Sequence, residues 1–579
     1  MMKQLQQFLA QYKNELFEAG DVLASKAMPE LTEELFVLFE TTGNRLQYEN
    51  IYFLRRKYLS VFAILAMQYR RERDLQLLAK VVSSVCDERC WALPAHINRG
   101  NDPHWEITVD LFAAETAFTL AEIVGKLGKQ LPANVCKRAT DEVFQRVLRP
   151  YMEKQPYAWW ENSDMNWNAV CNGSIGGAAI WLMKDAALLE PLLDRICANL
   201  QHYVTGFSED GACLEGFGYF TYGMSFFTAF ADMLLKYSGG RRNLFANERL
   251  EKIAHFPEVC FFPGGITLSF SDGDWKDTFR VGLMSRLKMQ YPEIRLPDFA
   301  NAAGLESDAC YRYLILSRDI FFTKDFLAQE RMQATAMAQM RQKGYPQKAQ
   351  KIACHYLFLQ AQWSICKSEN GCALAAKGGH NAEPHNHNDV GSFLYVRAGE
   401  MILADLGAGE YTAGYFGTQR YEYLCCRALG HNLPLIDGVE QKAGRVYAAS
   451  AFHSDAPGQI TIGIENAYGL ADNEKIIRNI QMDMESGCWE VSDCFALQPG
   501  RKVTENLLTH WPARAVADGF VITTERQTCR IRTNYGIDFR VREVTYCNHS
   551  GEEVKARLLQ WEVLEGQEVF GMFDNEKYI

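Results

Sequence analysis

The spacing of apolar residues divides this chain into two parts with different periods. Up to about residue 330, apolar positions recur at helical spacing, and Gly- and Pro-rich breaks separate the runs. The clearest run follows Asp102 and Pro103, where one predicted helix face carries Trp105, Val109, Phe112, Ile123 and Leu127. Further helices are predicted over residues 52–70, 178–200 and 226–237. This part therefore predicts a large array of antiparallel helix pairs.

Residues 331–350 form a connecting segment between the two parts. Beyond it, the apolar positions recur with a period of two. The runs 392–397 and 400–405 flank Ala398 and Gly399 and predict a hairpin. Further strands are predicted over residues 503–508, 519–524, 529–533 and 554–563. Strands at this density, without intervening helices, favour an antiparallel β-sandwich. We therefore predict an α+β multidomain protein, with a helical domain over residues 1–335 and a β-sandwich over residues 336–579.

Composition agrees with an ordinary globular protein of more than one domain. The chain has 579 residues, of which 48% are hydrophobic and 23% charged, so extensive disorder is not expected. Its net charge of −11 argues against a nucleic-acid partner. An anionic ligand remains compatible, because a local basic surface can oppose the global field.

Targeting signals and cysteine usage favour a cytoplasmic protein. The first residues form an amphipathic pattern without the apolar core of a signal peptide, and no apolar run is long enough to predict a membrane span. Seventeen cysteines are scattered without a repeating framework, which favours free thiols in a reducing compartment. A homodimer is compatible with the sequence.

Three histidines and an aspartate crowd one loop just before the predicted hairpin. His380, His385, His387 and Asp389 fall within ten residues, although the whole chain has only twelve histidines. Histidine accepts protons near neutral pH and is the commonest nitrogen ligand of zinc. The hairpin would bring Asp405 close to this loop, and a zinc site would form if His431 returned to the same end. The alternative is a hydrogen-bonded loop that caps the sheet.

Asparagines and aromatic residues form a second group in the helical part. Asn166, Asn168 and Asn172 precede or open a helix predicted to start near Gly176, beside Trp167. Such a group suits a carbohydrate platform, with amides for carboxylates and hydroxyls and flat rings for sugars. Helix capping and core packing are the ordinary alternatives.

Two tyrosine-rich segments complete the polar groups. Glycines around Tyr219 and Tyr222 predict accessible phenols at a loop-to-helix junction, where a phenol can act as acid or base; a glycine-rich turn is the alternative. After the hairpin, a loop carries Tyr415, Arg420 and Tyr421, and its arginine can bind a carboxylate or sulfate. A solvated surface loop is equally compatible with that composition.

In chain order, these groups resemble the heparinase II/III-like polysaccharide lyases over most of the chain. The shared motifs are Asn-Trp-Asn at 166–168, Glu-Gly-x-Gly-Tyr at 215–219, His-Asn-His-Asn-Asp-x-Gly-Ser-Phe at 385–393, Asp-x-Gly at 405–407 and Gly-His-Asn at 430–432. The resemblance implies an incomplete (α/α) toroid followed by an antiparallel β-sandwich. The long histidine motif and the order of the motifs are its most specific elements.

The resemblance also implies roles for individual residues. Tyr219 and His385 match the catalytic tyrosine and histidine. His387, Asp405 and His431 match the ligands of one mainly structural zinc ion. An asparagine would neutralise the substrate carboxylate, and Asn166, Asn168 and Asn172 remain alternatives. Substrate contacts are expected from Asn168, Asn172, Trp167, Glu215, Tyr415, Arg420 and Tyr421.

The expected activity is β-elimination at a uronic acid of an acidic polysaccharide or oligosaccharide, either glycosaminoglycan- or alginate-like. Two alternatives stay open. A glycoside hydrolase on an (α/α) toroid would need opposed carboxylates, for which Asp210 and Glu215 are available, but it would leave the histidine loop unexplained. A non-catalytic oligosaccharide-binding protein would bind the same ligands without turnover.

Overall fold

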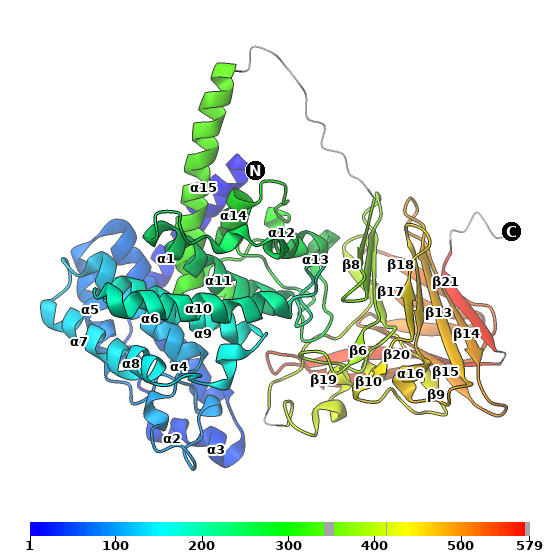
Figure 1. Ribbon diagram of the computed structural model, residues 1–579. Coiled ribbons are helices and arrows are strands. Elements are labelled where there is room, and N and C mark those ends of the chain that lie inside the picture. Colours follow the sequence, from blue (N-terminus) through cyan, green and yellow to red (C-terminus); the bar gives the residue numbers. More distant parts are fainter. Residues whose placement is uncertain (341–352, 413, 565, 574–579) are drawn as a thin grey trace. The chain divides into compact units, whose positions relative to one another are not determined.

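The computed structural model describes residues 1–340, 353–412, 414–564 and 566–573. Residues 341–350 of the predicted connecting segment lie outside the described residues. The chain forms two compact units that are each discontinuous in sequence (Figure 1). The first comprises Met1–Phe207, Tyr219–Ala254 and Thr278–Tyr345, and the second comprises Ser208–Gly218, His255–Asp277 and Pro346–Ile579. Two segments of the mainly helical region therefore belong to the second unit.

Helices build the first unit, as the period of the sequence predicts. The longer ones are α1 (Met2–Ala24), α4 (Leu46–Tyr69), α5 (Glu72–Cys86), α6 (Leu111–Leu127), α7 (Ala133–Val143), α9 (Asn166–Leu182), α10 (Ala186–Gly206), α11 (Phe217–Tyr237), α14 (Val281–Gln290) and α15 (Tyr313–Met340). The shorter ones are α2 (Glu33–Phe36), α3 (Leu38–Thr42), α8 (Arg149–Glu153) and α12 (Glu248–Ala254). Neighbours pack in pairs, among them α6 with α9, α9 with α10, and α14 with α15. The unit is the incomplete (α/α) toroid expected from the sequence.

At two of the wrongly predicted helix boundaries, an aspartate cap decides where the helix begins. The segment 178–200 is not one helix, because α9 ends at Leu182 and the Asp185 side chain accepts a hydrogen bond from the Ala187 N–H (2.9 Å) to begin α10. The run after Pro103 becomes α6 only at Leu111, because Asp110 accepts from the Ala113 N–H (2.8 Å). Among the described helices, none combines the length and apolarity that a membrane crossing requires.

Antiparallel sheets build the second unit, and three of them are large. The eight-stranded sheet has the order β11 (Ala451–His453), β12 (Gln459–Gly463), β13 (Lys475–Met482), β14 (Trp489–Ala496), β21 (Gln567–Met572), β18 (Thr528–Thr533), β17 (Gly519–Thr523) and β16 (Ala513–Val516). The four-stranded sheet is β19 (Gly536–Cys547), β20 (Glu553–Val563), β15 (Val503–Thr509) and β9 (Leu435–Ile436). The five-stranded sheet is β3 (Cys354–Phe358), β4 (Trp363–Lys367), β5 (Ala373–Lys377), β7 (Phe393–Arg397) and β8 (Glu400–Leu403).

Smaller elements complete this unit. Two-stranded pairs join β1 (Phe261–Phe262) to β2 (Ile266–Thr267) and β6 (His380–Asn381) to β10 (Gly444–Ala448). The short helices α13 (Phe256–Cys260) and α16 (Glu465–Tyr468) lie in the connections. The predicted hairpin is confirmed: β7 pairs with β8, and Ala398 and Gly399 both have positive φ (52° and 75°), as a two-residue primed turn requires.

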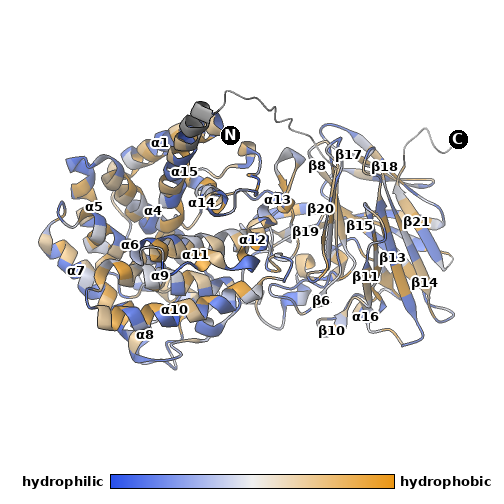
Figure 2. Cartoon of the chain, turned by 45° about the horizontal axis from the view of Figure 1, so that its top comes forward, coloured by the Kyte–Doolittle hydropathy of each residue, from blue (hydrophilic) through white to orange (hydrophobic). Residues whose placement is uncertain are grey.

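The sandwich core forms because side chains alternate along its strands. Buried and outward-facing positions alternate along β13 and β14, and blue and orange residues alternate there in Figure 2. One apolar cluster joins the three large sheets and includes Phe393, Trp489, Phe520, Trp561 and Phe570. The core therefore supplies a rigid base for the loops at the ends of β5, β7 and β8.

A buried arginine fastens two of these loops to the eight-stranded sheet. Arg478 on β13 has no exposed surface and forms an ion pair with Asp493 on β14 (2.6 Å). Its Nη1 donates to the carbonyls of Gly391 (2.9 Å) and Asn432 (2.7 Å). Gly391 follows the histidine loop and Asn432 follows His431, so one side chain holds both segments.

Candidate functional site

Asp272 is the centre of a buried polar site in the second unit. It lies in the turn after β2, next to Ser271 in the left-handed region (φ 60°), and its carboxylate has no exposed surface. The carboxylate accepts hydrogen bonds from five side chains, namely His385, His387, Tyr411, Tyr415 and Arg420. No sequence motif pointed to Asp272, because Ser-Asp-Gly-Asp in a loop is typical of an ordinary turn.

His385 is held against Asp272 by a hydrogen bond and has a left-handed backbone conformation. Its φ of 55° is uncommon for a residue other than glycine, and such strain often marks functional sites. Nδ1 donates to Oδ2 of Asp272 at 2.7 Å, and Nε2 lies 3.6 Å from Oε2 of Glu215. A carboxylate at Nδ1 selects the Nδ1–H tautomer of a neutral imidazole, which leaves the lone pair on Nε2.

The structure brings His387, Asp405 and His431 together at the end of the sheet. All three are fully buried, and atoms that could bind a metal lie within 4.8 Å of one another. The predicted hairpin is the reason why Asp405 could be placed near His387 from the sequence. The third arrives because the segment after the tyrosine-rich loop returns to the same end, which local spacing could not reveal.

The donor atoms of this set fit a cation. The Nε2–H of His431 donates to the Cys425 carbonyl (3.0 Å), so Nδ1 presents its lone pair to Oδ2 of Asp405 at 3.1 Å. Two acceptors this close require a proton or a cation between them. Neighbouring ligands of a tetrahedral zinc ion lie about 3.3 Å apart when the bonds are about 2.0–2.1 Å. Among the described residues, Nδ1 of His387 has no hydrogen-bond partner despite its burial, which is the state expected of a metal-binding nitrogen.

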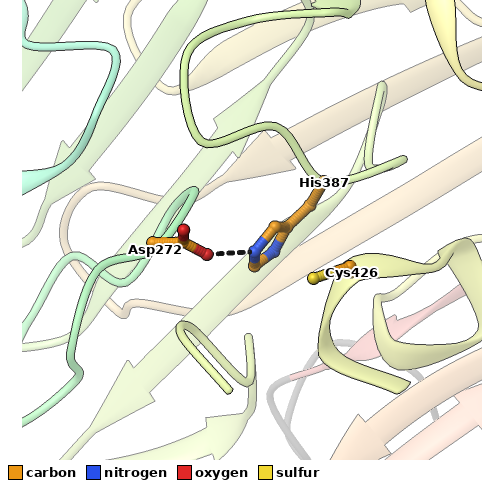
Figure 3. Close-up of side chains that lie close together, drawn as sticks. All are labelled: Asp272, His387 and Cys426. Atoms are coloured by element: carbon orange, nitrogen blue, oxygen red, sulfur yellow. Dashed lines mark hydrogen bonds and ion pairs between the residues drawn. The ribbon is translucent and has the colours of Figure 1, made fainter. Parts of the chain in front are cut away.

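A second set of donors shares His387. Asp272, His387 and Cys426 also place possible ligand atoms within 4.8 Å of one another, and Asp272 and Cys426 flank the imidazole ring (Figure 3). The Asp272 carboxylate accepts from Nε2 of His387 at 3.0 Å. Cys426 is fully buried and its Sγ lies 3.9 Å from that of Cys425. Neither Asp272 nor Cys426 lies in a motif that indicates a metal site.

Electrostatics around His387 favour a positive charge. Burial lowers the pKa of His387, but the negative charges of a Cys426 thiolate and of the Asp272 carboxylate outweigh it and raise that pKa to about 10. Burial raises the pKa of Asp272, but the hydrogen bonds from His385 and His387 hold it well below its usual value. A proton or a metal ion can supply the positive charge, and the two compete for the same nitrogen.

Backbone contact fixes the Asp272 turn against the Asp405 segment. The Ala408 N–H donates to the Gly273 carbonyl (3.1 Å), and Gly407 has a φ of 61°. A β-carbon at position 407 would lie 2.0 Å from that carbonyl oxygen, so only glycine permits the approach. The Asp-x-Gly motif therefore joins the two segments that hold the polar site.

Tyr219 and the asparagines belong to the first unit. Tyr219 lies half-buried in the first turn of α11, which begins at Phe217, so the predicted loop-to-helix junction is confirmed. The expected start of the asparagine-containing helix near Gly176 was wrong, because Asn166 already opens α9. Asn168 and Asn172 have no exposed surface and hold neighbouring groups by hydrogen bonds.

Trp167 lies beside an exposed aromatic face. Its ring centroid is 5.1 Å from that of Trp159, which is 63% exposed, and 4.9 Å from that of His96. His96 is itself held by Asp110 through Nδ1 (2.7 Å). Flat, exposed aromatic surface of this kind suits the apolar face of a sugar ring.

The tyrosine- and arginine-rich loop turns most of its polar groups inward. Tyr415 is fully buried and donates to Asp272 at 2.6 Å. The Arg420 guanidinium donates to both oxygens of Asp272 (3.2 Å each) and to the carbonyl of residue 386, and Tyr421 accepts from Asn386. The exposed large apolar side chain of this loop is Phe416, whose ring centroid lies 6.1 Å from that of His385; Thr418, Gln419 and Glu422 are exposed as well.

The helical toroid followed by antiparallel sheets is a heparinase-like polysaccharide lyase fold. A structure of heparinase III matches with a TM-score of 0.60 and 12% identity, covering 91% of this chain and 76% of that one. A second heparinase III structure matches with a TM-score of 0.59 and 13% identity, covering 98% and 85%. The heparan sulfate lyase HepC from Pedobacter heparinus matches with a TM-score of 0.51 and 11% identity, covering 92% and 76%. No family model and no curated protein matches the sequence.

Proposed function

We propose that this protein is a lyase that cleaves a uronic-acid-containing polysaccharide or oligosaccharide by β-elimination. The observation that carries the proposal is His385, a histidine in a left-handed backbone conformation whose Nδ1 is held by a buried carboxylate. This arrangement presents Nε2 as a proton acceptor, as general base catalysis requires. The fold shared with heparinase III and a heparan sulfate lyase supports the same reaction class.

The proposed reaction needs a base, an acid and neutralisation of the carboxylate. The base removes the C5 proton, the electron pair forms the C4–C5 double bond, the C4–O bond breaks, and the acid protonates the departing oxygen. We assign these proton transfers to His385 and Tyr219, and which of them acts first depends on the C5 configuration. The C5 proton is weakly acidic, so donors near the substrate carboxylate must stabilise the enolate-like intermediate by several kcal/mol.

We assign that stabilisation to Asn166. It opens α9 and keeps a small exposed fraction of 2%, whereas Asn168 and Asn172 have none. In this proposal Asn168 and Asn172 act through the packing of α9, and Tyr415 and Arg420 act through Asp272. Direct substrate contacts remain proposed for Trp167, Glu215 and Tyr421.

We assign one zinc ion to His387, Asp405 and His431, because the donor atoms fit a cation and are buried together. When bound, the ion ties the histidine loop to the segments carrying Asp405 and His431. His385 remains outside this set, since a metal-bound nitrogen cannot also accept a proton.

The test follows product absorbance with defined glycosaminoglycan, alginate and other uronate oligosaccharides. The new double bond is conjugated with the carboxylate, so wild-type protein is expected to increase ultraviolet absorbance with at least one of them. A hydrolase would yield products without this absorbance, and a binding protein would yield no product. Absence of absorbance with every uronate substrate would falsify the proposal.

Tyr219→Phe and His385→Ala are expected to lower kcat by about 10²–10⁴-fold, because each removes a proton-transfer group. Melting temperatures are expected to stay close to the wild-type value for Tyr219→Phe. Tyr237→Phe is the matched control, since Tyr237 lies on the same helix but is exposed at its far end. Near-wild-type turnover by Tyr219→Phe would remove that residue from the mechanism.

A further inference from the structure

One carboxylate, that of Asp272, holds the proposed proton acceptor and a proposed metal ligand at the same time. Oδ2 accepts from Nδ1 of His385 at 2.7 Å, and Oδ1 accepts from Nε2 of His387 at 3.0 Å. The two histidines therefore meet Asp272 through opposite ring nitrogens. Neither Asp272 nor its turn belongs to any motif by which the site was identified from sequence.

We propose that Asp272 is a positioning residue that sets complementary tautomers of His385 and His387, and so couples the proton acceptor to the zinc site. The inference rests on the proposed lyase function. A neutral imidazole carries one N–H, and a carboxylate is an acceptor only. Asp272 therefore places the proton of His385 on Nδ1. On His387 it holds the Nε2–H, so the proton that a zinc ion would displace is the one on Nδ1. The lone pairs are left on Nε2 of His385 and, once that proton is displaced, on Nδ1 of His387.

The surroundings of His387 agree with this assignment. Its Nδ1 is the nitrogen without a hydrogen-bond partner among the described residues. The other histidine of the metal set is oriented in the same manner, because the Nε2–H of His431 donates to the Cys425 carbonyl at 3.0 Å. Metal-binding histidines usually donate their second N–H to a carboxylate or a carbonyl, which fixes the ring and raises the basicity of the ligand nitrogen.

Three further donors keep the carboxylate itself in place. Tyr415 donates to Oδ1 (2.6 Å), Tyr411 donates to Oδ2 (3.1 Å), and Arg420 donates to both oxygens (3.2 Å each). A buried carboxylate with so many donors is costly to remove and cannot rotate freely. The orientation of both histidines thus follows from a carboxylate that is itself fixed.

Asparagine cannot replace Asp272 in this role. One carboxamide has a single oxygen, so it can accept from one histidine only, while its NH₂ group faces the N–H of the other. Asp272→Asn is expected to weaken zinc binding about 10–100-fold. It is also expected to lower kcat at least about 100-fold, with a change in KM of less than about threefold, because the tautomer of His385 is lost and substrate contacts are not.

Zinc affinity is measured by competition with a chromophoric chelator, which needs no substrate, and kcat and KM are measured by product absorbance. Asp274→Asn is the matched control, since Asp274 is exposed two residues away and its Oδ1 accepts a hydrogen bond from the Lys276 N–H. Wild-type zinc affinity or wild-type kcat in Asp272→Asn would overturn the proposal. If Asp272→Asn does not fold, Asp272→Glu is measured instead, because it keeps the charge but displaces the carboxylate oxygens. Zinc affinity and kcat are both expected to fall, by smaller factors than in Asp272→Asn. Wild-type values of either quantity would overturn the proposal.

Two outcomes separate this inference from others. If the wild-type protein forms no unsaturated product, the proposed lyase function is wrong. The zinc measurement then still tests whether Asp272 orients His387 for metal binding. If Asp272 is instead a metal ligand with His387 and Cys426, Cys426→Ser abolishes zinc binding and His431→Gln retains it, which contradicts the proposal. We expect the reverse: His431→Gln abolishes zinc binding, and Cys426→Ser keeps it.

Discussion

At the scale of residues, two histidines two positions apart share Asp272 but differ in their other neighbours and in their expected chemistry. His385 keeps 9% of its side chain exposed and faces Glu215 through Nε2, whereas His387 is fully buried and faces Asp405 and His431. A buried imidazole among acceptors suits a metal, and a partly exposed one suits proton transfer.

The two roles predict different responses to truncation. Protein purified without chelator is expected to hold about one zinc ion per chain. His387→Ala should lower both metal content and melting temperature, because it removes a ligand and leaves buried acceptors facing one another. His385→Ala should lower kcat by about 10²–10⁴-fold and retain the metal. Both are measured by elemental analysis and by thermal unfolding.

His453→Ala serves as the control for this pair, since His453 is an exposed residue of the same unit. It is expected to match the wild-type protein in metal content and stability. Loss of zinc in His385→Ala together with retention in His387→Ala would show that the two roles are reversed.

At the scale of elements, β13 and β14 carry a buried ion pair that anchors the site loops. Arg478 and Asp493 have no exposed surface, and Arg478 also satisfies the carbonyls of Gly391 and Asn432. A buried pair of this kind adds little net stability, but removing one partner leaves an uncompensated charge. The pair therefore specifies where the loops attach more than it stabilises the sandwich.

Arg478→Met is expected to reduce the free energy of unfolding by about 3–5 kcal/mol, because Asp493 would remain buried without a counter-charge. Arg530→Met is the matched control, since Arg530 forms an exposed ion pair with Asp518 on the same sheet, and its loss should cost about 1 kcal/mol or less. Denaturant unfolding measures both. Equal effects of the two substitutions would contradict the role given to the buried pair.

At the scale of the whole molecule, buried carboxyl groups make stability depend on pH. Burial raises the pKa of Glu568 on β21 to about 7 and that of Glu115 on α6 to about 7. Between the usual carboxyl value and pH 7, the folded protein then binds more protons than the unfolded chain. Stability from these two groups is therefore present at low pH and falls as pH rises toward 7.

Glu568→Gln is expected to reduce the drop in melting temperature between about pH 5 and about pH 8. The amide keeps the oxygen that accepts from the backbone N–H groups of Asn534 and Val569, and it removes the group whose ionisation is disfavoured. Calorimetry at both pH values measures the effect, with Glu553→Gln, an exposed glutamate of β20, as control. An unchanged pH dependence in Glu568→Gln would exclude this contribution.

Much of the architecture was predictable because periodicity is a local property. The helical and strand periods, the primed turn at Ala398 and Gly399, and the pairing of Asp405 with the histidine loop all depend on residues close in sequence. Helix boundaries at Asp110 and Asp185 were missed because an N-cap overrides the apolar spacing around it.

The sequence by itself determined the order of helices and strands, the hairpin, and the residue types available for proton transfer and metal binding. Only the tertiary structure decided which of them meet. Asp272 lies 113 residues before His385, and no local spacing relates two residues so far apart. Burial is likewise a property of the packed molecule, so the inward orientation of Tyr415 and Asn168 could not be read from their neighbours. The centre of the site, one carboxylate shared by two histidines, exists only because the fold closes that distance.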